Sequence, residues 1–333
     1  MGENLPLELL NGVSVFAYLI EQGIIKAGEE TAIDELTGGV SNTVLAITTK
    51  TRNFVLKQAL PELKVAKKWE ADQRRAIVEA DALRLFHKLS PRQVPKLVFI
   101  DPVNYVLIME RTPLNSTLWK TDLLDGIYNT EVSRVLGRTL ASWHRFGAEN
   151  PEHLTKFKED KLFEQLRIDP FYRFVANRNP LLRKSIGRLI DELEADHSTI
   201  VHGDFSPKNI MVSASGEVYI LDFEVTHVGN PVFDLAFLLA HLLCKFFRAE
   251  NSNDTSALVT LAQEFVHEYE IVHPISPSLV QHTALIALAR VEGKSPVNYL
   301  SPIQQERLAI FTKTILSQGE SINTLALFDV SAK

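Results

Sequence analysis

The chain has 333 residues, of which 45% are hydrophobic and 23% charged, and this ordinary composition excludes disordered, collagen-like and coiled-coil classes. Its formal net charge of -6 argues against a general nucleic-acid binder, because such proteins usually carry a basic excess. The single cysteine, Cys244, excludes an internal disulfide. The most apolar stretch, Pro231–Phe247, is too short and too charged to span a bilayer. We therefore expect a globular, cytoplasmic protein of about two domains, with neither a nucleic-acid nor a membrane partner.

The first third of the chain predicts a small sheet with helices. Apolar residues at helical spacing indicate helices over Val13–Gln22 and Glu62–Leu89. Short runs rich in β-branched and apolar residues indicate strands, which lie at Thr43–Thr48, Phe54–Gln58, Leu97–Ile100 and Tyr105–Met109. Turn-like segments separate these strands in pairs, as in antiparallel hairpins. An antiparallel sheet with one long helix packed on it is an α+β layer.

From Pro113 onward the pattern becomes mostly helical. Six segments carry apolar residues at helical intervals, at Ile127–Phe146, Leu181–Asp196, Val232–Phe247, Ser256–Ile271, Ser278–Arg290 and Pro302–Ser317. One β element interrupts them, within Ile200–Leu221. We therefore predict an α+β protein with an N-terminal lobe over residues 1–111 and a C-terminal lobe over residues 112–333.

The segment from Ile200 to Glu224 carries the strongest chemical signal. Two short apolar strands flank a Ser/Gly turn, which predicts a β-hairpin. A hairpin centred on that turn places Asn209 beside Asp222, and Asp204 precedes Asn209 in the same loop. Carboxylate and amide oxygens suit a hard cation, and Mg²⁺ typically takes only one or two protein ligands. The sequence therefore predicts a Mg²⁺ site at Asn209 and Asp222.

Here the sequence resembles a known superfamily. Asp-x-x-x-x-Asn followed by a hairpin and Asp-Phe is similar to the catalytic and metal-binding loops of the protein-kinase-like fold. His-Gly-Asp at 202–204 and Asp-Phe-Glu at 222–224 resemble the aminoglycoside phosphotransferase and choline kinase superfamily. The run 229–236 is similar to that superfamily's Gly-Asp-Pro-x-x-Asp-Leu-Ala, with Asn230 at the first Asp. The resemblance covers nearly the whole chain and implies a bilobal kinase-like fold.

The resemblance also implies a nucleotide site in the N-terminal lobe. The run 36–42 resembles the nucleotide-binding loop, in which backbone N–H groups cradle phosphates. Lys57 matches the strand lysine that holds the α- and β-phosphates, and Glu79 on the long helix matches its ion-pair partner. The family's hinge bonds adenine through its backbone. The remaining ATP-binding candidates, in the loop and the hinge, are Gly38, Gly39, Ser41, Asn42, Met109, Glu110 and Arg111.

The expected reaction is phosphoryl transfer from ATP, with GTP as an alternative donor and Mg²⁺ as cofactor. Asp204 is the candidate catalytic base, because an aspartate within hydrogen-bond reach can position a hydroxyl and accept its proton. Lys208 is expected either to neutralise the transferring group or to lie in solvent. His202 and Asp234 are expected to support the loop, since Asp234 resembles the helix aspartate that braces it through backbone hydrogen bonds.

The acceptor site is expected in the helical C-terminal lobe, as in the superfamily that the chain resembles. The candidate contacts are Lys208, Glu224, His227, Arg290 and Glu292. Arg290 and Glu292 also fit a purely structural role, because a helix C-terminus commonly carries basic and capping residues. The mild acidic balance weakly favours a cationic acceptor by steering.

We predict a small-molecule kinase that phosphorylates a hydroxyl of a sugar-like or amino-sugar acceptor. The alternatives left open are a methylthioribose kinase, which the run 57–61 resembles, a choline or amino-alcohol kinase, and an inactive nucleotide-binding scaffold. A protein kinase is disfavoured, because the chain lacks Ala-Pro-Glu and the interval from Glu224 to Asp234 is too short for a long activation segment. The oligomeric state stays open.

Overall fold

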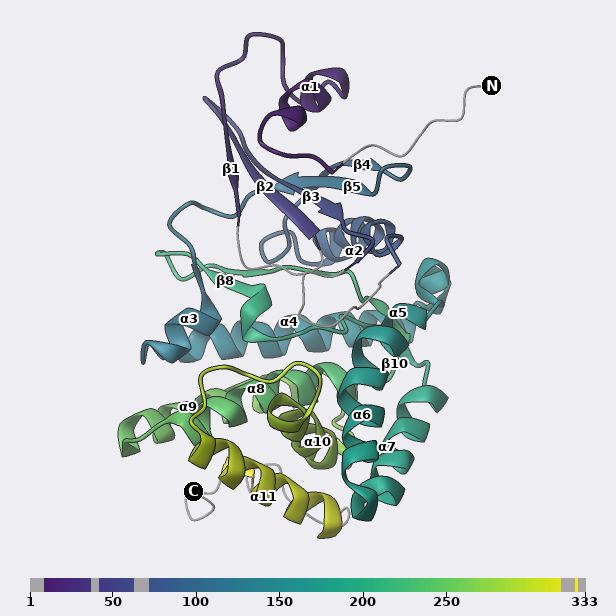
Figure 1. Ribbon diagram of the computed structural model, residues 1–333, viewed down its shortest axis with the longest axis vertical. Coiled ribbons are helices and arrows are strands. Elements are labelled where there is room, and N and C mark those ends of the chain that lie inside the picture. Colours follow the sequence, from purple (N-terminus) through teal and green to yellow (C-terminus); the bar gives the residue numbers. More distant parts are fainter. Residues whose placement is uncertain (1–8, 37–41, 63–71, 319–326, 329–333) are drawn as a thin grey trace. The chain divides into compact units, whose positions relative to one another are not determined.

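A computed structural model describes residues 9–36, 42–62, 72–318 and 327–328. The chain divides into two compact units, Met1–Asn115 and Ser116–Lys333 (Figure 1). Among the described residues, no helix combines the length and the apolar character that a membrane span requires.

The first unit is built on a five-stranded antiparallel sheet with the strand order β1-β2-β3-β5-β4 (Figure 1). The strands are β1 (Thr31–Glu35), β2 (Asn42–Thr49), β3 (Asn53–Ala59), β4 (Leu97–Asp101) and β5 (Val106–Glu110). The strands β2 to β5 match the four predicted ones to within one or two residues, and β1 adds a fifth on the edge. Sequential hairpins account for the β1-β2-β3 and β4-β5 pairs.

The two faces of this sheet bury different side chains. Alternate residues point to opposite faces of a strand, so Leu56 and its neighbour Lys57 on β3 lie on different sides. Leu56 packs with residues of α1 (Ser14–Glu21) in one apolar cluster. The helix α2 (Arg75–Leu89) packs against β3, β4 and β5. This alternation directs Lys57 toward α2.

The long predicted helix is shorter in the structure. α2 begins at Arg75 rather than at Glu62, and residues 63–71 lie outside the described part of the chain. The Arg75 side chain is buried and donates to the carbonyl oxygens of Leu60 at 2.6 Å and Asp72 at 3.1 Å. The bond to Leu60 ties the start of α2 to the residue that follows β3.

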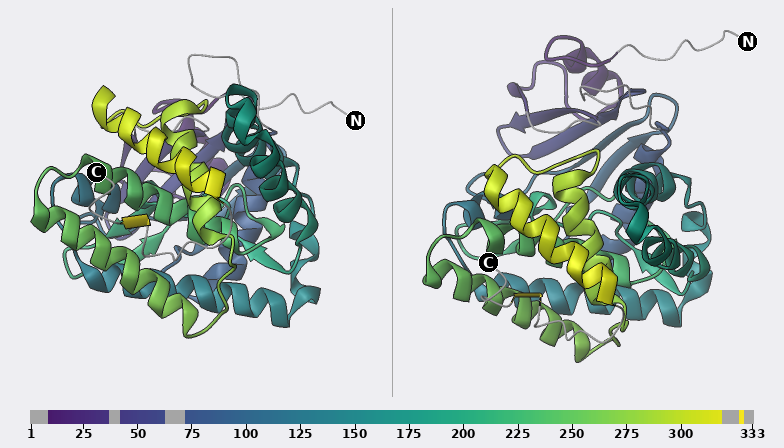
Figure 2. Two further views of the ribbon diagram at one scale, coloured as in Figure 1. Left: turned by 90° about the horizontal axis from the view of Figure 1, so that it is seen from below. Right: turned by 60° about the horizontal axis from the view of Figure 1, so that its bottom comes forward.

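The second unit is mostly helical. Its α-helices are α3 (Trp119–Leu124), α4 (Thr130–Glu149), α5 (Lys161–Phe163), α6 (Phe174–Arg178), α7 (Arg183–Ala195), α8 (Val232–Arg248), α9 (Ser252–Glu270), α10 (Leu279–Glu292) and α11 (Pro302–Gln318). Helix α8 is buried along nearly its whole length, as its mostly apolar sequence indicates. It packs against α9 and α10, and α11 covers α10 (Figure 2).

Sequence analysis did not predict the helical segment from Lys161 to Arg178. It consists of α5, the π-helix η2 (Glu164–Arg173) and α6. Pro170 lies inside η2 and lacks the N–H that an α-helix needs there, which favours a wider helical turn.

Short strands flank the loops of the second unit. They are β6 (Thr117–Leu118), β7 (Thr199–Val201), β8 (Ile210–Val212), β9 (Val218–Ile220) and β10 (His227–Gly229). They form an antiparallel β6-β8-β9 sheet and an antiparallel β7-β10 pair. Three 3₁₀ turns complete the unit, namely η1 (Pro151–Phe157), η3 (Pro180–Leu182) and η4 (Pro207–Asn209).

Candidate active site

The loop between β7 and β8 holds the predicted catalytic residues, and Gly203 sets its path. Gly203 has a φ of +77°, in the left-handed region that favours glycine. A Cβ at this position would lie 2.7 Å from the carbonyl oxygen of Val225. Only glycine therefore allows the loop to turn this closely past the segment that leads into β10.

Asp234, in the first turn of α8, holds this loop through hydrogen bonds to its backbone. Its Oδ2 accepts from the backbone N–H of His202 at 2.7 Å, and its Oδ1 accepts from that of Gly203 at 2.9 Å. His144 Nε2 lies 3.3 Å from Oδ2. Burial alone would raise the pKa of Asp234, but the hydrogen bond and charge of His144, with those of His202, lower it below the usual value. The two backbone bonds are those expected of a bracing aspartate.

His202 links the loop to the segment that carries Asp222. Its Nδ1 accepts from the backbone N–H of Asp204 at 3.1 Å, and its Nε2 lies 3.2 Å from the carbonyl oxygen of Leu221. Burial lowers the pKa of His202, which favours the neutral ring that this pattern requires. The imidazole therefore lies between the loop that carries Asp204 and the segment that carries Asp222, and its two nitrogens contact both.

Asp204 is almost completely buried, and donors surround one of its two carboxylate oxygens. Oδ2 accepts from Asn209 Nδ2 at 2.8 Å and pairs with Lys208 Nζ at 2.7 Å and Arg167 Nη2 at 3.1 Å. No described residue donates to Oδ1. One oxygen is thus held in place while the other stays available for chemistry.

Arg167 was not predicted from the sequence. It lies in η2, and besides its contact with Asp204 its Nε donates to the carbonyl oxygen of Gly203 at 2.6 Å. Its guanidinium also lies over the ring of Phe237, 5.5 Å from the centroid. An isolated arginine in a polar helix carries no motif, so only the folded structure reveals this contact.

The predicted register of the hairpin is wrong by one residue. Ile210 pairs with Ile220 and the backbone N–H of Leu221 donates to the carbonyl of Asn209 at 2.8 Å, so Asn209 lies opposite Leu221 rather than Asp222. The turn is centred on Ser215, because five residues, 213–217, connect the strands. Asp222 follows directly with a φ of +69°, a left-handed conformation that aspartate tolerates better than most residues.

The donor set at this end of the hairpin fits a hard divalent cation. Asn209 donates through Nδ2 to Asp204, and its Oδ1 accepts from no described residue. Its amide oxygen and the carboxylate of Asp222 are ligand types that Mg²⁺ prefers. Among the described residues, no group of three His, Cys, Asp or Glu side chains is arranged around a metal position. Two oxygen ligands of this kind are what a cation completed by phosphate and water requires.

In the first unit, Lys57 and Glu79 form a buried ion pair. Lys57 Nζ lies 2.7 Å from Glu79 Oε1, and both side chains are at most 8% exposed. Lys57 projects from the α2-facing side of the sheet, and Glu79 lies on α2. A buried lysine held this way keeps its charge in a fixed position.

The other nucleotide candidates divide into two groups. Gly38, Gly39 and Ser41 lie outside the described residues, and Asn42 is buried at the start of β2. In the hinge, Met109 is buried at the end of β5. The backbone N–H groups of Glu110 and Arg111 donate to Lys96 and Asn53. These two N–H groups are therefore used inside the first unit.

The residues predicted to contact the acceptor also differ in their surroundings. Glu224 is buried directly after the Asp222 segment. His227 is a core residue, because it stacks on Phe163 with ring centroids 4.0 Å apart, and burial lowers its pKa to about 4. Glu292 pairs with Lys313 at 2.6 Å and accepts from Asn179, so it ties helices together.

Among the residues predicted to contact the acceptor, Arg290 interacts electrostatically with Asp204. Its guanidinium lies over the ring of Phe171 at 5.7 Å. Burial lowers the pKa of Arg290, and the carboxylate of Asp204 raises it.

Comparisons with known proteins agree on one family. The chain is 26% identical over 269 residues to the methylthioribose kinase of Geobacillus kaustophilus, a match that covers 71% of this chain and 66% of that enzyme. The methylthioribose kinase of Bacillus cereus strain AH187 is 27% identical over 267 residues, with 70% and 66% covered. The matched segment thus spans just under two thirds of these relatives.

Solved structures share the fold at lower identity. An amicoumacin kinase in complex with AMP-PNP, Ca²⁺ and Ami superposes with a TM-score of 0.56 at 14% identity, covering 91% of this chain and 94% of that one. A choline kinase from Streptococcus pneumoniae superposes with a TM-score of 0.51 at 15% identity, covering 92% and 98%. These superpositions confirm the predicted kinase-like α+β fold.

A family model for the phosphotransferase enzyme family matches residues 32–273, which include the Lys57–Glu79 pair, the catalytic loop and all of α9. The resemblance inferred from the sequence is thereby confirmed. The chain belongs to the phosphotransferase enzyme family.

Proposed function

We propose that this protein transfers the γ-phosphoryl group of ATP to a hydroxyl of a small, sugar-like molecule, with Mg²⁺ as the cation. The observation that carries the proposal is the asymmetry of Asp204. Oδ2 is held by Arg167, Lys208 and Asn209, and Oδ1 accepts from no described residue. A carboxylate oxygen presented this way can orient a hydroxyl and take up its proton.

The remaining groups would neutralise the negative charge of the donor nucleotide. Asn209 and Asp222 would hold the cation, which when bound neutralises phosphate oxygens. Lys57, fixed by Glu79 at 2.7 Å, would neutralise the α- and β-phosphates. Lys208, 2.7 Å from Asp204, is placed to offset negative charge on the transferring group. Because this transition state is loose, such positioning supplies most of the catalysis.

The acceptor class is supported by the relatives that the chain resembles. Methylthioribose kinases, at 26–27% identity, favour a hydroxylated sugar-like acceptor. An amino alcohol is the alternative suggested by the choline kinase, which shares the fold at 15% identity. The proposed substrate is therefore small and hydroxylated.

The test is a transfer screen read by ADP release. The panel contains methylthioribose, other sugars, aminoglycosides, choline and amino alcohols, each with Mg·ATP or with ATP and a chelator. We expect ADP release that requires both Mg²⁺ and one acceptor class. Asp222→Ala should abolish Mg²⁺-dependent ATP binding in calorimetry, because it removes a carboxylate ligand. Tight Mg·ATP binding by this variant, or phosphorylation of peptides alone, would overturn the proposal.

A further inference from the structure

Four cationic side chains of the second unit gather around His241, and we refer to them as the cationic cluster. They are Lys120, Lys208, Lys245 and Arg290, and the charges of all four lower the pKa of His241. They come from α3, η4, α8 and α10, so the fold rather than one sequence motif assembles them. The sequence singled out only Lys208 and Arg290.

Three members of the cationic cluster have no acidic partner. Lys208 pairs with Asp204, but within the described chain no ion pair joins Lys120, Lys245 or Arg290 to a carboxylate. Lys245 is only 2% exposed, and burial lowers its pKa to about 7. Buried cations normally occur with a counter-charge, because their desolvation is expensive. The cationic cluster is therefore a costly arrangement that the fold alone does not require.

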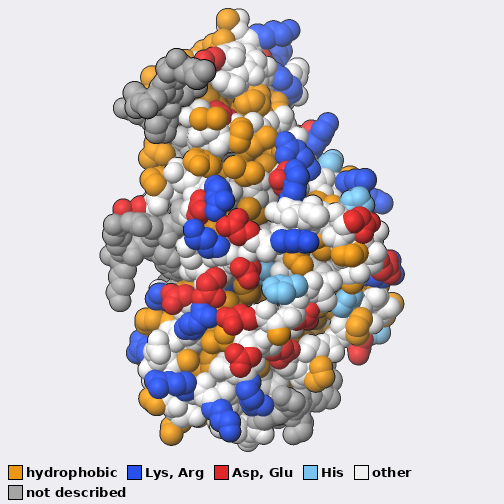
Figure 3. All heavy atoms as spheres, turned by 90° about the vertical axis from the view of Figure 1, so that its right-hand side faces the viewer, with side chains coloured by type: hydrophobic (Ala, Val, Ile, Leu, Met, Phe, Trp, Pro, Cys, Tyr) orange, Lys and Arg blue, Asp and Glu red, His pale blue; other side chains and the backbone are white. Residues whose placement is uncertain are grey.

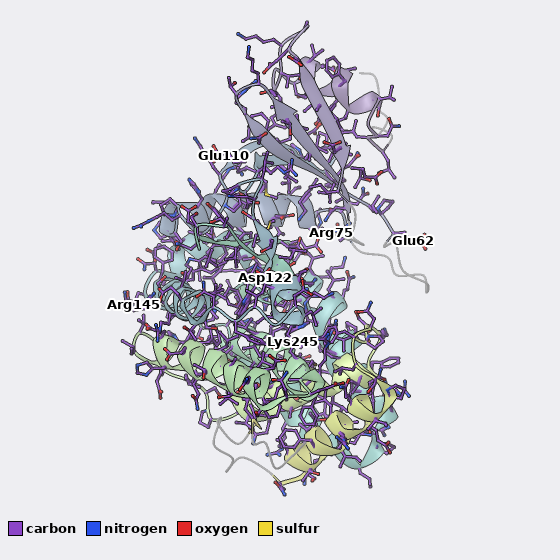
Figure 4. All side chains as sticks on the ribbon, turned by 90° about the vertical axis from the view of Figure 1, so that its left-hand side faces the viewer. Glu62, Arg75, Glu110, Asp122, Arg145 and Lys245 are labelled. Atoms are coloured by element: carbon purple, nitrogen blue, oxygen red, sulfur yellow. The ribbon has the colours of Figure 1, made fainter. Side chains whose placement is uncertain are left out.

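One face of α8 connects this cluster to the catalytic loop. Phe237, His241 and Lys245 follow each other at four-residue spacing, which places them along one side of the helix. The rings of Phe237 and His241 lie 5.3 Å apart, and Lys245 Nζ donates to the His241 carbonyl oxygen at 3.3 Å. Figure 4 labels Lys245 on this helix. Arg167, which contacts Asp204, lies over the Phe237 ring at the other end.

Buried polar atoms in the same region lack hydrogen-bond partners. They are the donors Arg290 Nε and Tyr299 Oη and the ring nitrogen His241 Nε2, none of which bonds a described residue. Lys245 Nζ lies 5.3 Å from the centre of the Tyr299 ring. Buried polar atoms are nearly always satisfied in folded proteins, so the unsatisfied donors of Arg290 and Tyr299 beside side chains without an acidic partner point to a missing acceptor of hydrogen bonds.

The cationic cluster differs from the protein surface in its charge composition. It also extends toward solvent near Asp204. On the face drawn in Figure 3, Lys and Arg side chains are interspersed with Asp and Glu. Among the ion pairs of the described residues, only that of Lys208 with Asp204 joins the cluster to a carboxylate. The side chain of Lys208 is 47% exposed, whereas Lys245 is buried. A ligand that extends from Asp204 along α8 would pass from solvated to buried positive charge.

We propose that the acceptor is a hydroxylated compound with an oxyanion group, a carboxylate or a phosphate, which Arg290 and Lys245 bind while Asp204 receives the reacting hydroxyl. This inference rests on the proposed kinase function and names its substrate class. It differs from the amino-sugar acceptor predicted from the family resemblance, which the net charge of the whole chain favoured only weakly, because the four side chains of the cationic cluster are basic.

Binding is tested by calorimetry on the full chain without nucleotide. Gluconate and inorganic phosphate serve as anionic probes, and glucose and glucosamine as neutral and cationic controls. We expect the anions to bind, and Arg290→Met and Lys245→Met to weaken them about tenfold or more. Arg290→Lys should retain most of the affinity. The control Lys184→Met makes the same change at an exposed lysine on α7 and should have no effect.

If the Lys245 and Arg290 variants fail to fold, Lys120 provides a further test, because this half-buried position tolerates substitution. Lys120→Met should weaken both anions severalfold. Binding of glucose or glucosamine as tight as that of gluconate, or anion affinities unchanged in all the Met variants of the cluster, would overturn the inference.

Transfer assays separate this inference from the proposed function. A panel of glucose, glucosamine, gluconate and glucose 6-phosphate compares the carboxylate and phosphate forms with their controls, and we expect the anionic members to be the better acceptors. Lys57→Met should abolish transfer yet leave gluconate binding intact. Absence of Mg·ATP-dependent transfer to every member of the panel by the parent chain would contradict the kinase proposal, and normal transfer by Lys57→Met would contradict the role of Lys57. Lys57-dependent transfer to neutral or cationic acceptors alone would contradict only the anionic class.

Discussion

Asp204 has two oxygens with different surroundings, and this difference decides what a substitution does. In Asp204→Asn, the three donors at Oδ2 would hold the amide oxygen, so the amide nitrogen would replace Oδ1. A donor would then stand where the acceptor hydroxyl needs a base. We expect kcat to fall by about 10²–10⁴-fold with ATP affinity nearly unchanged. Steady-state kinetics on the true substrate checks this, and full turnover by the variant would remove Asp204 from the chemistry.

Arg167 acts on the reaction through Asp204 and is a positioning residue. It holds both the carboxylate and the Gly203 carbonyl oxygen, at 3.1 and 2.6 Å. Arg167→Met should lower kcat about tenfold with little change in the KM for ATP, because Asp204 loses one of its fixed contacts. Arg167→Lys should restore part of kcat by returning the charge. Thermal unfolding of both variants provides the stability control, and a loss of stability without any change in kcat would make Arg167 purely structural.

At the scale of elements, the tight loop between β7 and β8 depends on Gly203. Gly203→Ala would require a strained φ of +77° and place a Cβ 2.7 Å from a backbone oxygen. We expect a loss of about 1–3 kcal/mol in the free energy of unfolding, with kcat reduced because the loop must shift. Gly187→Ala on α7 is the matched control, since no atom lies within 4 Å of its Cβ and alanine favours a helix. Urea unfolding of both variants decides whether the effect belongs to this position.

The same elements show how far sequence reasoning reaches. The hairpin and its turn follow from local patterns and the bracing role of Asp234 from the family resemblance, and the structure contains the corresponding bonds. The register failed by one residue because it depends on which turn residue is central, and Ser/Gly-rich turns allow several centres. Arg167 was missed because its partner lies 36–37 positions away and its own helix contains Pro170.

For the whole molecule, the family and the fold could be predicted because their motifs are contiguous. The proposed anionic acceptor site could not, since α3, η4, α8 and α10 bring its charges together only on folding. If the acceptor is anionic as proposed, the net charge of the whole chain is a poor guide to it for the same reason. A sum of -6 over 333 residues averages away a buried region with the opposite sign.

The stability of the second unit should fall in mild acid, because it buries neutral histidines. Burial lowers the pKa values of His202, His227 and His241, that of His227 to about 4. The unfolded chain therefore binds more protons than the folded one between pH 6.5 and 4, so stability rises with pH across that window and is lost on acidification. For His227 alone the loss between pH 7 and pH 5 is on the order of 2 kcal/mol.

Urea unfolding followed by the fluorescence of the buried Trp119 and Trp143 measures this effect in the second unit. We expect the urea midpoint to fall steadily from pH 7 to pH 5. His227→Gln cannot take up a proton, so its midpoint should depend less on pH even though the variant loses the stacking contact with Phe163. An equally steep pH dependence in the variant, or a flat one in the parent chain, would show that these histidines are not buried in neutral form.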